Sequence, residues 1–494
     1  MPLQITTQDI TMRHPMGMRC ATDFYYAKVG NLLLRRLLRN PAKQELSEEV
    51  IMKMALKVVL YFEDIICDSG IWRSFAEKHQ ALYGRILPFY SFNGDYYADE
   101  PHVEDIQLLL WDVMMEEHEN EIINPENPGL SAIAYDFYEV LDDEFEKAPI
   151  NETLKDFFEH PVFTNDFIEM RNVLQWICST CYLTAGRYKL RGFHETFESI
   201  VKLLRFDRQD NRALYAAMCQ QPFKYKTGML AMLPQEWLAG FLECNGRNAE
   251  AAELRAIEFR SYDLYRLDGF DDTFIRLSDT QGREVVVRKD SYGDMRDSTL
   301  MATDGCVASF VKYLGEWNTN GMDSWGRFGK VYEEQREKKH RYKSGVPQKN
   351  YEAMMKKSGG SPLFYLRDGK DARHFLMEEV GIPGNLMRPS ELDDKEYMVA
   401  WVPSPDEDVF FGPDAALNIK DERNPYYKAV VDAETSMDLI SAPDRLPGDM
   451  IRYLIAHDML PDAALNHLGG AEAGRKLAQK NLDFLARSIR RDQY

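Results

Sequence analysis

Apolar side chains recur at helical spacing through the first half of the chain. From Ser47 onward they stand three or four positions apart, which places them on one face of an α-helix. Ser47 occupies the position of a helix cap, acidic residues follow it, and Gly70 stands where the helix should end. The apolar stripe of this predicted helix consists of Ile51, Met54, Ala55, Val58, Phe62, Ile65 and Ile66. Similar stripes continue to Arg260, so we expect a large, irregular α-helical N-terminal domain.

The pattern changes between Thr273 and Gly321. Short runs of β-branched and aromatic residues alternate there with Asp, Gly and Asn, which is typical of strands joined by tight turns. Asp279 and Gly282 bound a short polar segment between two such runs, and we expect a hairpin turn at that point. The segment therefore predicts a small SH3-like β-barrel that separates two unlike halves.

The rest of the chain is first basic and then mixed in character. Strand-like runs at 363–366 and 397–402 lie on either side of a helical pattern at 371–380, which predicts a small α/β layer. We therefore expect an α+β fold with four regions. These are a helical domain at 1–265, an SH3-like β-unit at 266–325, a basic helical linker at 326–362 and a mixed α/β C-terminal domain at 363–494.

The charge of the chain is strongly negative and unevenly placed. A formal net charge of −20 opposes indiscriminate binding to nucleic acid or anionic lipid, because these carry the same sign. No Lys or Arg occurs between Ile86 and Glu146, whereas basic residues predominate between Arg327 and Lys357. Seven cysteines, an odd number, and an N-terminus without a charged leader and apolar run indicate a reducing, cytoplasmic setting. No apolar run approaches the roughly 20 residues that cross a bilayer, so we expect no membrane association.

Two patterns could supply a metal or redox site, and neither is favoured. Cys178 and Cys181 have the spacing of such a pair, but both fall on the apolar stripe of a predicted helix without a second pair, which favours core packing. Glu63 and Asp64 could serve a carboxylate-bridged metal in a helical bundle, but that site needs Glu-x-x-His on each of two helices. We expect these carboxylates to meet an Arg or a helix terminus instead. The sequence therefore predicts no catalytic residue, no cofactor and no metal site.

The sequence contains more candidate residues for binding a protein or nucleic acid than for a metal or redox site. Trp317 and Trp325 lie on either side of the turn that contains Asn320, and aromatic side chains at the end of a hairpin can line a peptide groove. The alternative is that both rings close the barrel against the helices. In the basic region, Lys338, Lys339 and Arg341 stand among tyrosines, a combination that suits single-stranded nucleic acid. The alternative there is a solvated helix with local ion pairs.

Several short motifs together resemble a family of bacterial proteins of no assigned function that share a domain. The motifs are Tyr61-Phe-Glu-Asp-Ile-Ile, Gly70-Ile-Trp-Arg-Ser-Phe, Glu104-Asp-Ile-Gln-Leu-Leu-Leu-Trp111, Ile123-Asn-Pro-Glu-Asn-Pro128, Gly315-Glu-Trp-Asn-Thr-Asn-Gly321 and Asn424-Pro-Tyr-Tyr427. They span most of the chain, and none is a catalytic signature. The resemblance implies a cytoplasmic protein with several structural parts, and it supplies no functional residue.

We therefore predict a non-enzymatic binding or scaffold protein whose acidic helical face and Trp-containing β-unit contact a protein partner. A nucleic-acid-associated protein that uses residues 327–357 is the first alternative. The second is an enzyme whose site is assembled from residues scattered along the sequence.

Overall fold

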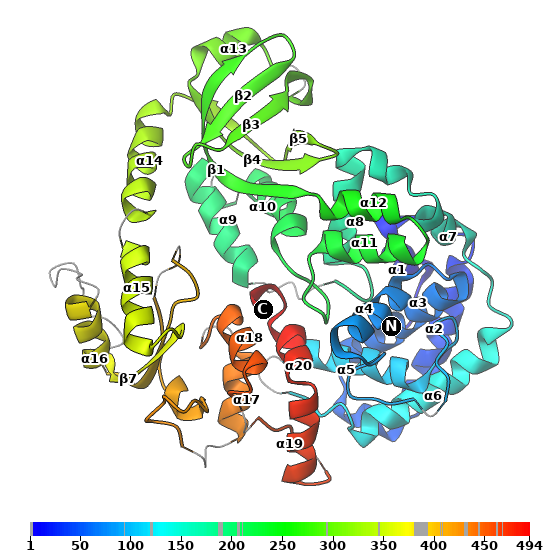
Figure 1. The fold of residues 1–494 in the computed structure, drawn as a ribbon. Helices are drawn as coiled ribbons and strands as arrows, with labels where there is room; N and C mark the ends of the chain where they lie inside the picture. Colours follow the sequence, from blue (N-terminus) through cyan, green and yellow to red (C-terminus); the bar gives the residue numbers. More distant parts are fainter. Residues whose placement is uncertain are drawn as a thin grey trace. The chain divides into compact units, whose positions relative to one another are not determined.

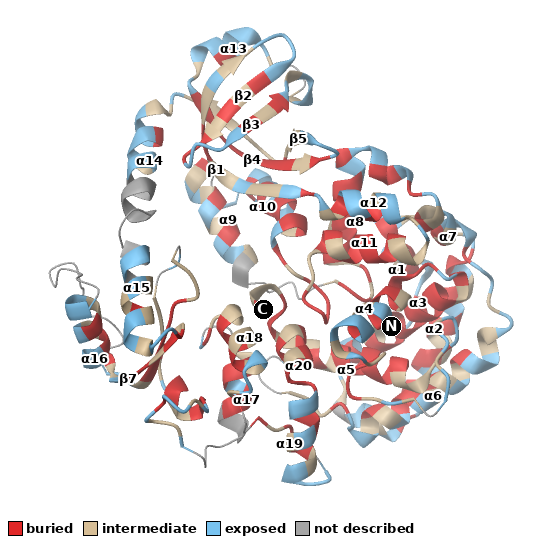
Figure 2. Ribbon diagram, in the orientation of Figure 1, coloured by how far each residue is buried: buried red, intermediate tan, exposed pale blue. Residues whose placement is uncertain are grey.

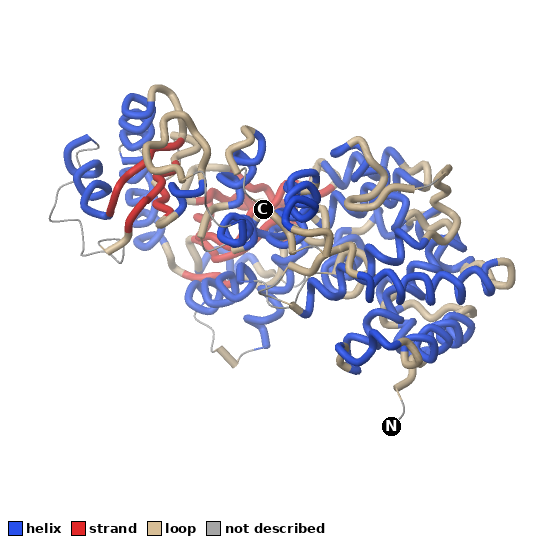
Figure 3. The backbone as a smooth tube through the Cα atoms, turned by 90° about the horizontal axis from the view of Figure 1, so that it is seen from below, coloured by secondary structure: helices blue, strands red, loops and turns tan. Residues whose placement is uncertain are grey.

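The computed structural model describes the chain apart from residues 1–2, 93, 119–121, 186–190, 205–207, 210, 293–294, 344–345, 380–393, 406, 408, 429–432, 443–444, 461–462 and 467. It divides into two units (Figure 1). The first consists of Met1–Leu277 and Val285–Arg327, and the second of Ser278–Glu284 and Phe328–Tyr494. Both contain helices and strands, which confirms the predicted mixture of α and β structure (Figure 3).

The first unit begins with a series of helices whose inner faces are buried (Figure 2). They are α1 (Thr7–Thr11), α2 (Asp23–Leu37), α3 (Glu48–Cys67), α4 (Ile71–Tyr83), α5 (Val103–Glu117), α6 (Pro128–Phe145), α7 (Glu152–Glu159), α8 (Phe167–Ser179), α9 (Arg191–Leu204), α10 (Asn211–Lys224), α11 (Pro234–Cys244) and α12 (Asn248–Arg255). Short 3-10 turns at Pro15–Gly17, Pro41–Glu45 and Val162–Asn165 connect some of them. Among the described residues, no helix combines the length and the apolar character that a membrane span requires.

Helix α3 is the central helix of this unit. The Ser47 side chain accepts a hydrogen bond from the Val50 backbone N–H, as the cap pattern predicts, and such a cap contributes about 1 kcal/mol. Every residue from Met54 to Ile65 is buried, so the helix is enclosed on all sides and not only along its apolar stripe. This enclosure brings Lys57, Glu63 and Asp64 into the interior. Buried ionisable groups of this kind require partners.

Six strands follow these helices, and we call them, together with one short helix, the strand unit. It contains β1 (Glu258–Phe270), β2 (Phe274–Asp279), β3 (Glu284–Arg288), β4 (Gly305–Tyr313), β5 (Glu316–Thr319) and β6 (Ser324–Gly326), together with helix α13 (Asp297–Ala302). The strand order is β1-β2-β3-β5-β4-β6, and β1 also pairs with β4. The pairings of β1 through β5 therefore form a closed ring. The helix predicted up to Arg260 ends earlier, at Arg255, and β1 begins at Glu258.

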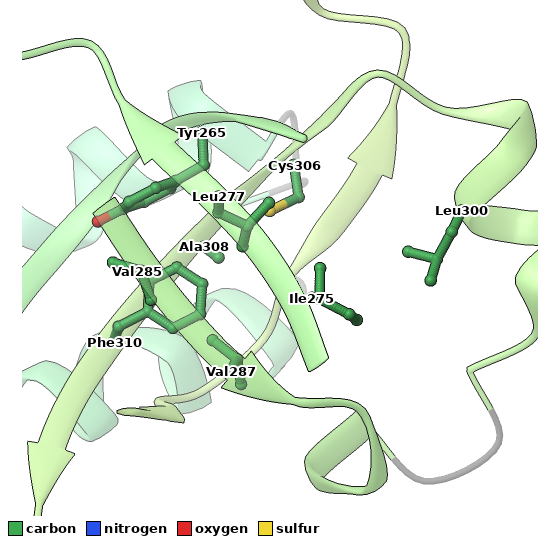
Figure 4. Close-up of a cluster of buried hydrophobic side chains, with 9 residues drawn as sticks. All are labelled: Tyr265, Ile275, Leu277, Val285, Val287, Leu300, Cys306, Ala308 and Phe310. Atoms are coloured by element: carbon green, nitrogen blue, oxygen red, sulfur yellow. The ribbon is translucent and has the colours of Figure 1, made fainter. Parts of the chain in front are cut away.

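The interior of the strand unit is apolar (Figure 4). Side chains from β1 to β4 meet there, and Leu300 of α13 adds to them from the side. The cluster consists of Tyr265, Ile275, Leu277, Val285, Val287, Leu300, Cys306, Ala308 and Phe310. A Cβ atom at Gly305 would lie 2.3 Å from the carbonyl oxygen of Tyr265, so the approach of β4 to β1 requires a glycine at this position.

Strand β4 is buried on both faces, since its other side packs on the helices of the same unit. Ser309 accepts a 3.0 Å hydrogen bond from the Gln220 amide of α10. The Tyr313 hydroxyl donates to the carbonyl oxygen of Thr164 at 2.6 Å. These contacts explain why β4 is buried along almost its whole length and not only at alternate positions.

The second unit combines helices with a three-stranded sheet. Its elements are α14 (Gly329–Lys343), α15 (Val346–Ser358), β7 (Leu363–Asp368), α16 (Gly369–His374), a π-helical turn at Phe375–Glu379, β8 (Glu396–Trp401), β9 (Phe410–Gly412), α17 (Ala433–Ser441), α18 (Gly448–Ala456), α19 (Ala471–Lys480) and α20 (Leu482–Arg490). The sheet is antiparallel, in the order β7-β8-β9. The two predicted strands are present, and β9 was not anticipated. The predicted basic linker forms α14 and α15.

Candidate functional site

Trp317 on β5 is half-buried and packs against the apolar interior of the strand unit. The Arg260 guanidinium lies 4.5 Å from the centre of its ring, and Lys312 lies 5.9 Å away. Cations at these distances are attracted to the face of an indole. The ring therefore has two cationic neighbours within its own unit.

Asn320 and Trp325 make polar contacts within the first unit. Asn320 is buried, and its amide donates to the carbonyl oxygen of Cys219 on α10 at 2.8 Å. Trp325 donates its indole N–H to the carboxylate of Asp323, and its ring meets Tyr292 edge to face at 5.6 Å between centroids. Trp317 and Trp325 lie on different strands, β5 and β6, each of which pairs with β4.

The predicted cationic residues Lys338, Lys339 and Arg341 belong to α14, but their side chains lie outside the described residues. Two described cations of the same basic region have acidic neighbours. Arg336 lies 3.3 Å from Glu333, and Lys357 lies 2.8 Å from Glu379. Local pairs of this kind are part of the alternative interpretation of the region as a solvated helix.

The acidic stretch that lacks Lys and Arg receives cations from earlier helices. Arg36 of α2 pairs with Asp136 of α6 at 3.0 Å. Lys53 of α3 pairs with Glu117 of α5 at 2.6 Å, and Lys57 pairs with the buried Asp112. These ion pairs thus neutralise part of the negative charge that runs along this stretch of the sequence.

Helix α10 has an unusual distribution of side-chain size. Its buried positions include Ala213, Ala216 and Ala217, each without exposed area. Its exposed positions carry three large apolar residues, Leu214, Tyr215 and Met218, which are 44%, 45% and 41% exposed. We call these three residues the α10 ridge. The burial of small residues and the exposure of large ones is the reverse of what core packing requires.

Arg171 of α8 connects the α10 ridge to the strand unit. One of its guanidinium nitrogens donates to the Asn320 side-chain oxygen at 3.4 Å, and another donates to the Tyr215 hydroxyl at 3.2 Å. Asn320 is therefore linked to an exposed surface although it is itself buried. The sequence pattern did not reveal this surface, because Leu214, Tyr215 and Met218 read as ordinary core residues of a helix. The outward direction of their stripe could be recognised only once the neighbours of α10 were known.

The interior of the helical region contains a polar network. Asp64 accepts hydrogen bonds from the backbone N–H groups of Ile71 and Trp72, at 3.2 and 2.7 Å, and so caps helix α4 as the expectation of a helix terminus suggested. It also accepts from the Tyr182 hydroxyl at 2.7 Å. Burial raises the pKa of Asp64, and these hydrogen bonds oppose that rise.

Asp105 forms a second part of the network. Its Oδ2 atom accepts from the hydroxyls of Tyr61, at 2.8 Å, and Tyr96, at 3.3 Å. Its Oδ1 atom is buried without a hydrogen-bond partner. Burial raises the pKa of Asp105 to about 8, despite the opposing effect of the hydroxyl donors. Asp105 is therefore largely protonated at neutral pH.

Glu63 forms the third part, with His14 as its partner. His14 Nε2 lies 2.8 Å from Glu63 Oε2, and both side chains are buried. The Asn151 amide donates to the other oxygen of Glu63 at 2.7 Å. The expectation that Glu63 would meet an Arg or a helix terminus was therefore wrong, since the partner is a histidine that lies 49 positions earlier in the sequence.

The other nitrogen of His14 faces two further polar groups. Nδ1 lies 3.5 Å from Cys20 Sγ and 3.5 Å from Asp23 Oδ1. It is also 3.1 Å from the carbonyl oxygen of Met18. Burial by itself lowers the pKa of His14, but the hydrogen bonds to Cys20 and Glu63 outweigh it and raise the pKa to about 11. Without another cation in the cluster, the ring carries protons on both nitrogens.

This cluster was not recognised in the sequence. His14, Cys20 and Asp23 occur within ten positions of one another, and that proximity of three ligand types is the signal that could have found it. They are the group of His, Cys, Asp and Glu residues in the described structure whose ligand atoms converge, within 4.8 Å of one another. Cys178 and Cys181, by contrast, are free, buried thiols, and burial raises the pKa of both. Their environment agrees with core packing.

Comparison with known proteins places the chain in a family. No curated protein and no solved structure matches it. A family model described as a protein of unknown function (DUF3843) matches residues 5–283 and 330–491, which is most of the chain. The chain therefore belongs to the DUF3843 family of proteins of unknown function.

Proposed function

We propose that this protein is a non-enzymatic binding protein that contacts a protein partner through the α10 ridge. The observation that carries the proposal is the size distribution on α10, where alanines are buried and Leu214, Tyr215 and Met218 are exposed. Leu214 and Met218 are separated by four positions, so they lie on the same side of the helix. Large apolar side chains in this arrangement are the anchors by which a helix surface recognises another protein.

The chemistry of Tyr215 favours a protein partner. Tyrosine supplies a large contact area together with a polar group that water can reach before binding, and it is enriched at protein interfaces. Arg171 already holds the Tyr215 hydroxyl at 3.2 Å. A side chain that is ordered before binding loses less conformational entropy when the complex forms.

The strand unit has a supporting role in this proposal. The closed ring of pairings from β1 through β5 supports its assignment as an SH3-like barrel. Asn320 and Gln220 attach it to α10, and it thereby fixes the orientation of the helix. We further propose a bacterial, cytoplasmic protein. The seven free cysteines agree with a reducing compartment.

The proposal is tested by comparing partner recovery for ridge variants and a matched control. The double variant Leu214→Asp, Met218→Asp places two charges on the ridge at positions that are already exposed, so it should fold. Met301→Asp is the control, since Met301 is 75% exposed on α13 of the same unit. We expect the tagged wild-type protein and the control to recover the same partner and the double variant to lose it. Equal recovery by all three proteins would contradict the proposal.

Nucleic-acid association through residues 327–357 is the second candidate. It is favoured by the exposed cations Lys330, Arg336, Lys349, Lys356 and Lys357 on α14 and α15. Binding to a single-stranded oligonucleotide should then weaken steeply as salt rises, because each neutralised phosphate releases counterions. Charge reversal at Lys349 and Lys356 should weaken it further. Affinity that does not change with salt would exclude this candidate.

A further inference from the structure

One buried oxygen atom in the cluster around His14 accepts no hydrogen bond from the protein. Asp23 is buried, with 5% of its surface exposed, and its Oδ1 atom has no hydrogen-bond partner. Its other oxygen accepts from the Thr11 hydroxyl at 2.6 Å and from the Cys20 backbone N–H at 3.2 Å. These two donors fix the carboxylate so that Oδ1 faces His14 Nδ1, at 3.5 Å. A buried carboxylate oxygen without a donor is costly unless something else occupies its free side.

Two of the three ligand separations within the cluster match those of ligands around a metal ion. Ligand atoms at about 2.0–2.3 Å from a tetrahedral zinc ion lie about 3.3–3.6 Å from one another. His14 Nδ1 is 3.5 Å from Cys20 Sγ and 3.5 Å from Asp23 Oδ1. All three ligand atoms lie within 4.8 Å of one another, so small side-chain movements bring them around one ion.

Glu63 supplies the outer contact that metal-binding histidines usually have. A histidine that binds a metal through one nitrogen almost always donates its other N–H to a carboxylate or carbonyl group, which fixes the tautomer. Glu63 Oε2 lies 2.8 Å from His14 Nε2, so the proton is held there and Nδ1 is the nitrogen that can bind. Glu63 is itself oriented by Asn151, which donates to its other oxygen.

The charge of the cluster distinguishes a metal site from a nucleophilic thiol. Cys20, His14 and Glu63 also lie in the order in which a catalytic site places a nucleophile, its base and the carboxylate that orients the base. However, Asp23 adds a second carboxylate beside the thiol, and a thiolate would be a third negative group around one ring. A divalent cation between these groups compensates their combined negative charge.

We propose that His14 Nδ1, Cys20 Sγ and Asp23 Oδ1 form a binding site for a divalent transition-metal ion, with zinc as the ion that best suits this donor set. The combination of imidazole, thiolate and carboxylate is typical of zinc. Binding displaces the Nδ1 proton and the thiol proton to solvent, while the Nε2 proton stays on the hydrogen bond to Glu63. Cys20 is half-buried, so an ion can enter from its side. The Met18 carbonyl oxygen also lies beside the cluster, 3.1 Å from His14 Nδ1 and 3.9 Å from Cys20 Sγ.

The ion would have a structural role. The ligands join the segment after α1 to the start of α2, and Glu63 extends the connection to α3. This site is compatible with a binding protein, and it does not depend on the α10 ridge.

The test is metal binding by the full chain after removal of metals with a chelator. We expect one Zn²⁺ per chain, and a Co²⁺ complex whose absorption spectrum shows a bond from the metal to thiolate. Cys20→Ser should weaken Zn²⁺ binding by at least about 100-fold, and Glu63→Gln should weaken it by about 10–100-fold. Cys244→Ser is the matched control and should bind as the wild type does, because Cys244 is also half-buried and also lies beside a carboxylate, that of Glu77, at 3.7 Å.

Three results would overturn the proposal. They are a wild-type chain that binds no Zn²⁺ at micromolar concentration, a Co²⁺ complex without a thiolate band, and equal binding by Cys20→Ser and Cys244→Ser. The Co²⁺ spectrum of the wild-type protein decides the question even if Cys20→Ser fails to fold.

Discussion

The side-chain amide of Asn320 donates a 2.8 Å hydrogen bond to the carbonyl oxygen of Cys219, although the two residues are 101 positions apart in sequence. This bond attaches the turn after β5 to helix α10 at Cys219, one helical turn after Tyr215 of the exposed ridge. Gly321 next to it has a φ of +95°, and a Cβ atom there would lie 2.6 Å from the Tyr262 hydroxyl oxygen. The turn is therefore held closely against the helix.

Replacement of Asn320 with Ala should destabilise the first unit by about 1–3 kcal/mol. The change leaves the buried carbonyl of Cys219 without this donor and removes an acceptor from Arg171. The free energy of unfolding, measured with urea, checks the expectation. Asn318→Ala is the matched control, because the Asn318 amide bonds only an exposed local carbonyl, that of Glu316. It should change stability by less than about 0.5 kcal/mol.

Comparison of sequence and structure shows which parts of the fold local patterns encode. Helix α3 is predicted correctly because its cap at Ser47 and its apolar spacing are local properties of the chain. Strand β1 was not predicted, because charged residues such as Arg260 and Asp263 interrupt its apolar alternation. It is a strand because it pairs with β4, across a sequence separation that no local pattern reports.

The candidate sites likewise depend on long-range contacts that local sequence patterns do not report. Trp317 and Asn320 stand out in sequence as an aromatic residue and a turn residue. Their sequence positions do not show that the Trp317 ring lies beside Arg260 or that the Asn320 amide is buried. Glu63 is recognisable as an acidic residue beside an apolar stripe, yet its partner His14 comes from a different segment. The properties that decide function here are the direction a side chain faces and the identity of its distant neighbours.

The protonated state of Asp105 should give the stability a characteristic dependence on pH. The pKa of Asp105 is about 8 in the folded protein, whereas an Asp in an unfolded chain has a pKa near about 3.9. Between these values the folded protein holds a proton that the unfolded chain has released. The free energy of unfolding should therefore decrease as pH rises through this window, by up to about 1.4 kcal/mol per pH unit, and the loss should be complete above about pH 8.

Asp105→Asn removes this titration while keeping the shape of the protonated acid. Urea unfolding of the variant from pH 4 to pH 9 should show a smaller decline in stability than the wild type. Asp143→Asn serves as the control, since Asp143 is exposed on α6. A variant profile parallel to that of the wild type would show that Asp105 is ionised in the folded protein at neutral pH.

Arg490 should be essential for the C-terminal helices of the second unit. It is 2% exposed, and its guanidinium donates to the carbonyl oxygens of Leu439, Ile440, Ala442 and Leu446. Several of these carbonyls belong to the end of α17, where helical partners are absent. Arg490→Met removes all four donors and should destabilise this region by about 3 kcal/mol or more.

Hydrogen exchange over α17 measures this effect directly. The amides of residues 433–441 should exchange about 100-fold faster or more in Arg490→Met, since about 1.4 kcal/mol corresponds to a factor of ten. Arg490→Lys should give an intermediate rate, because one ammonium group cannot reach four carbonyl oxygens. Unchanged exchange in both variants would mean that α17 is held by its apolar contacts alone.

The most direct test of partner binding is photo-cross-linking in cells from a photoreactive phenylalanine analogue placed at position 215. The side chain of Tyr215 is 45% exposed at the centre of the α10 ridge, and a probe there should give a discrete cross-linked species with one partner. The same probe at position 301, which is exposed on α13 away from the ridge, should give no such species. If position 215 gives no adduct, or if both positions give the same adducts, the α10 ridge is not a binding surface.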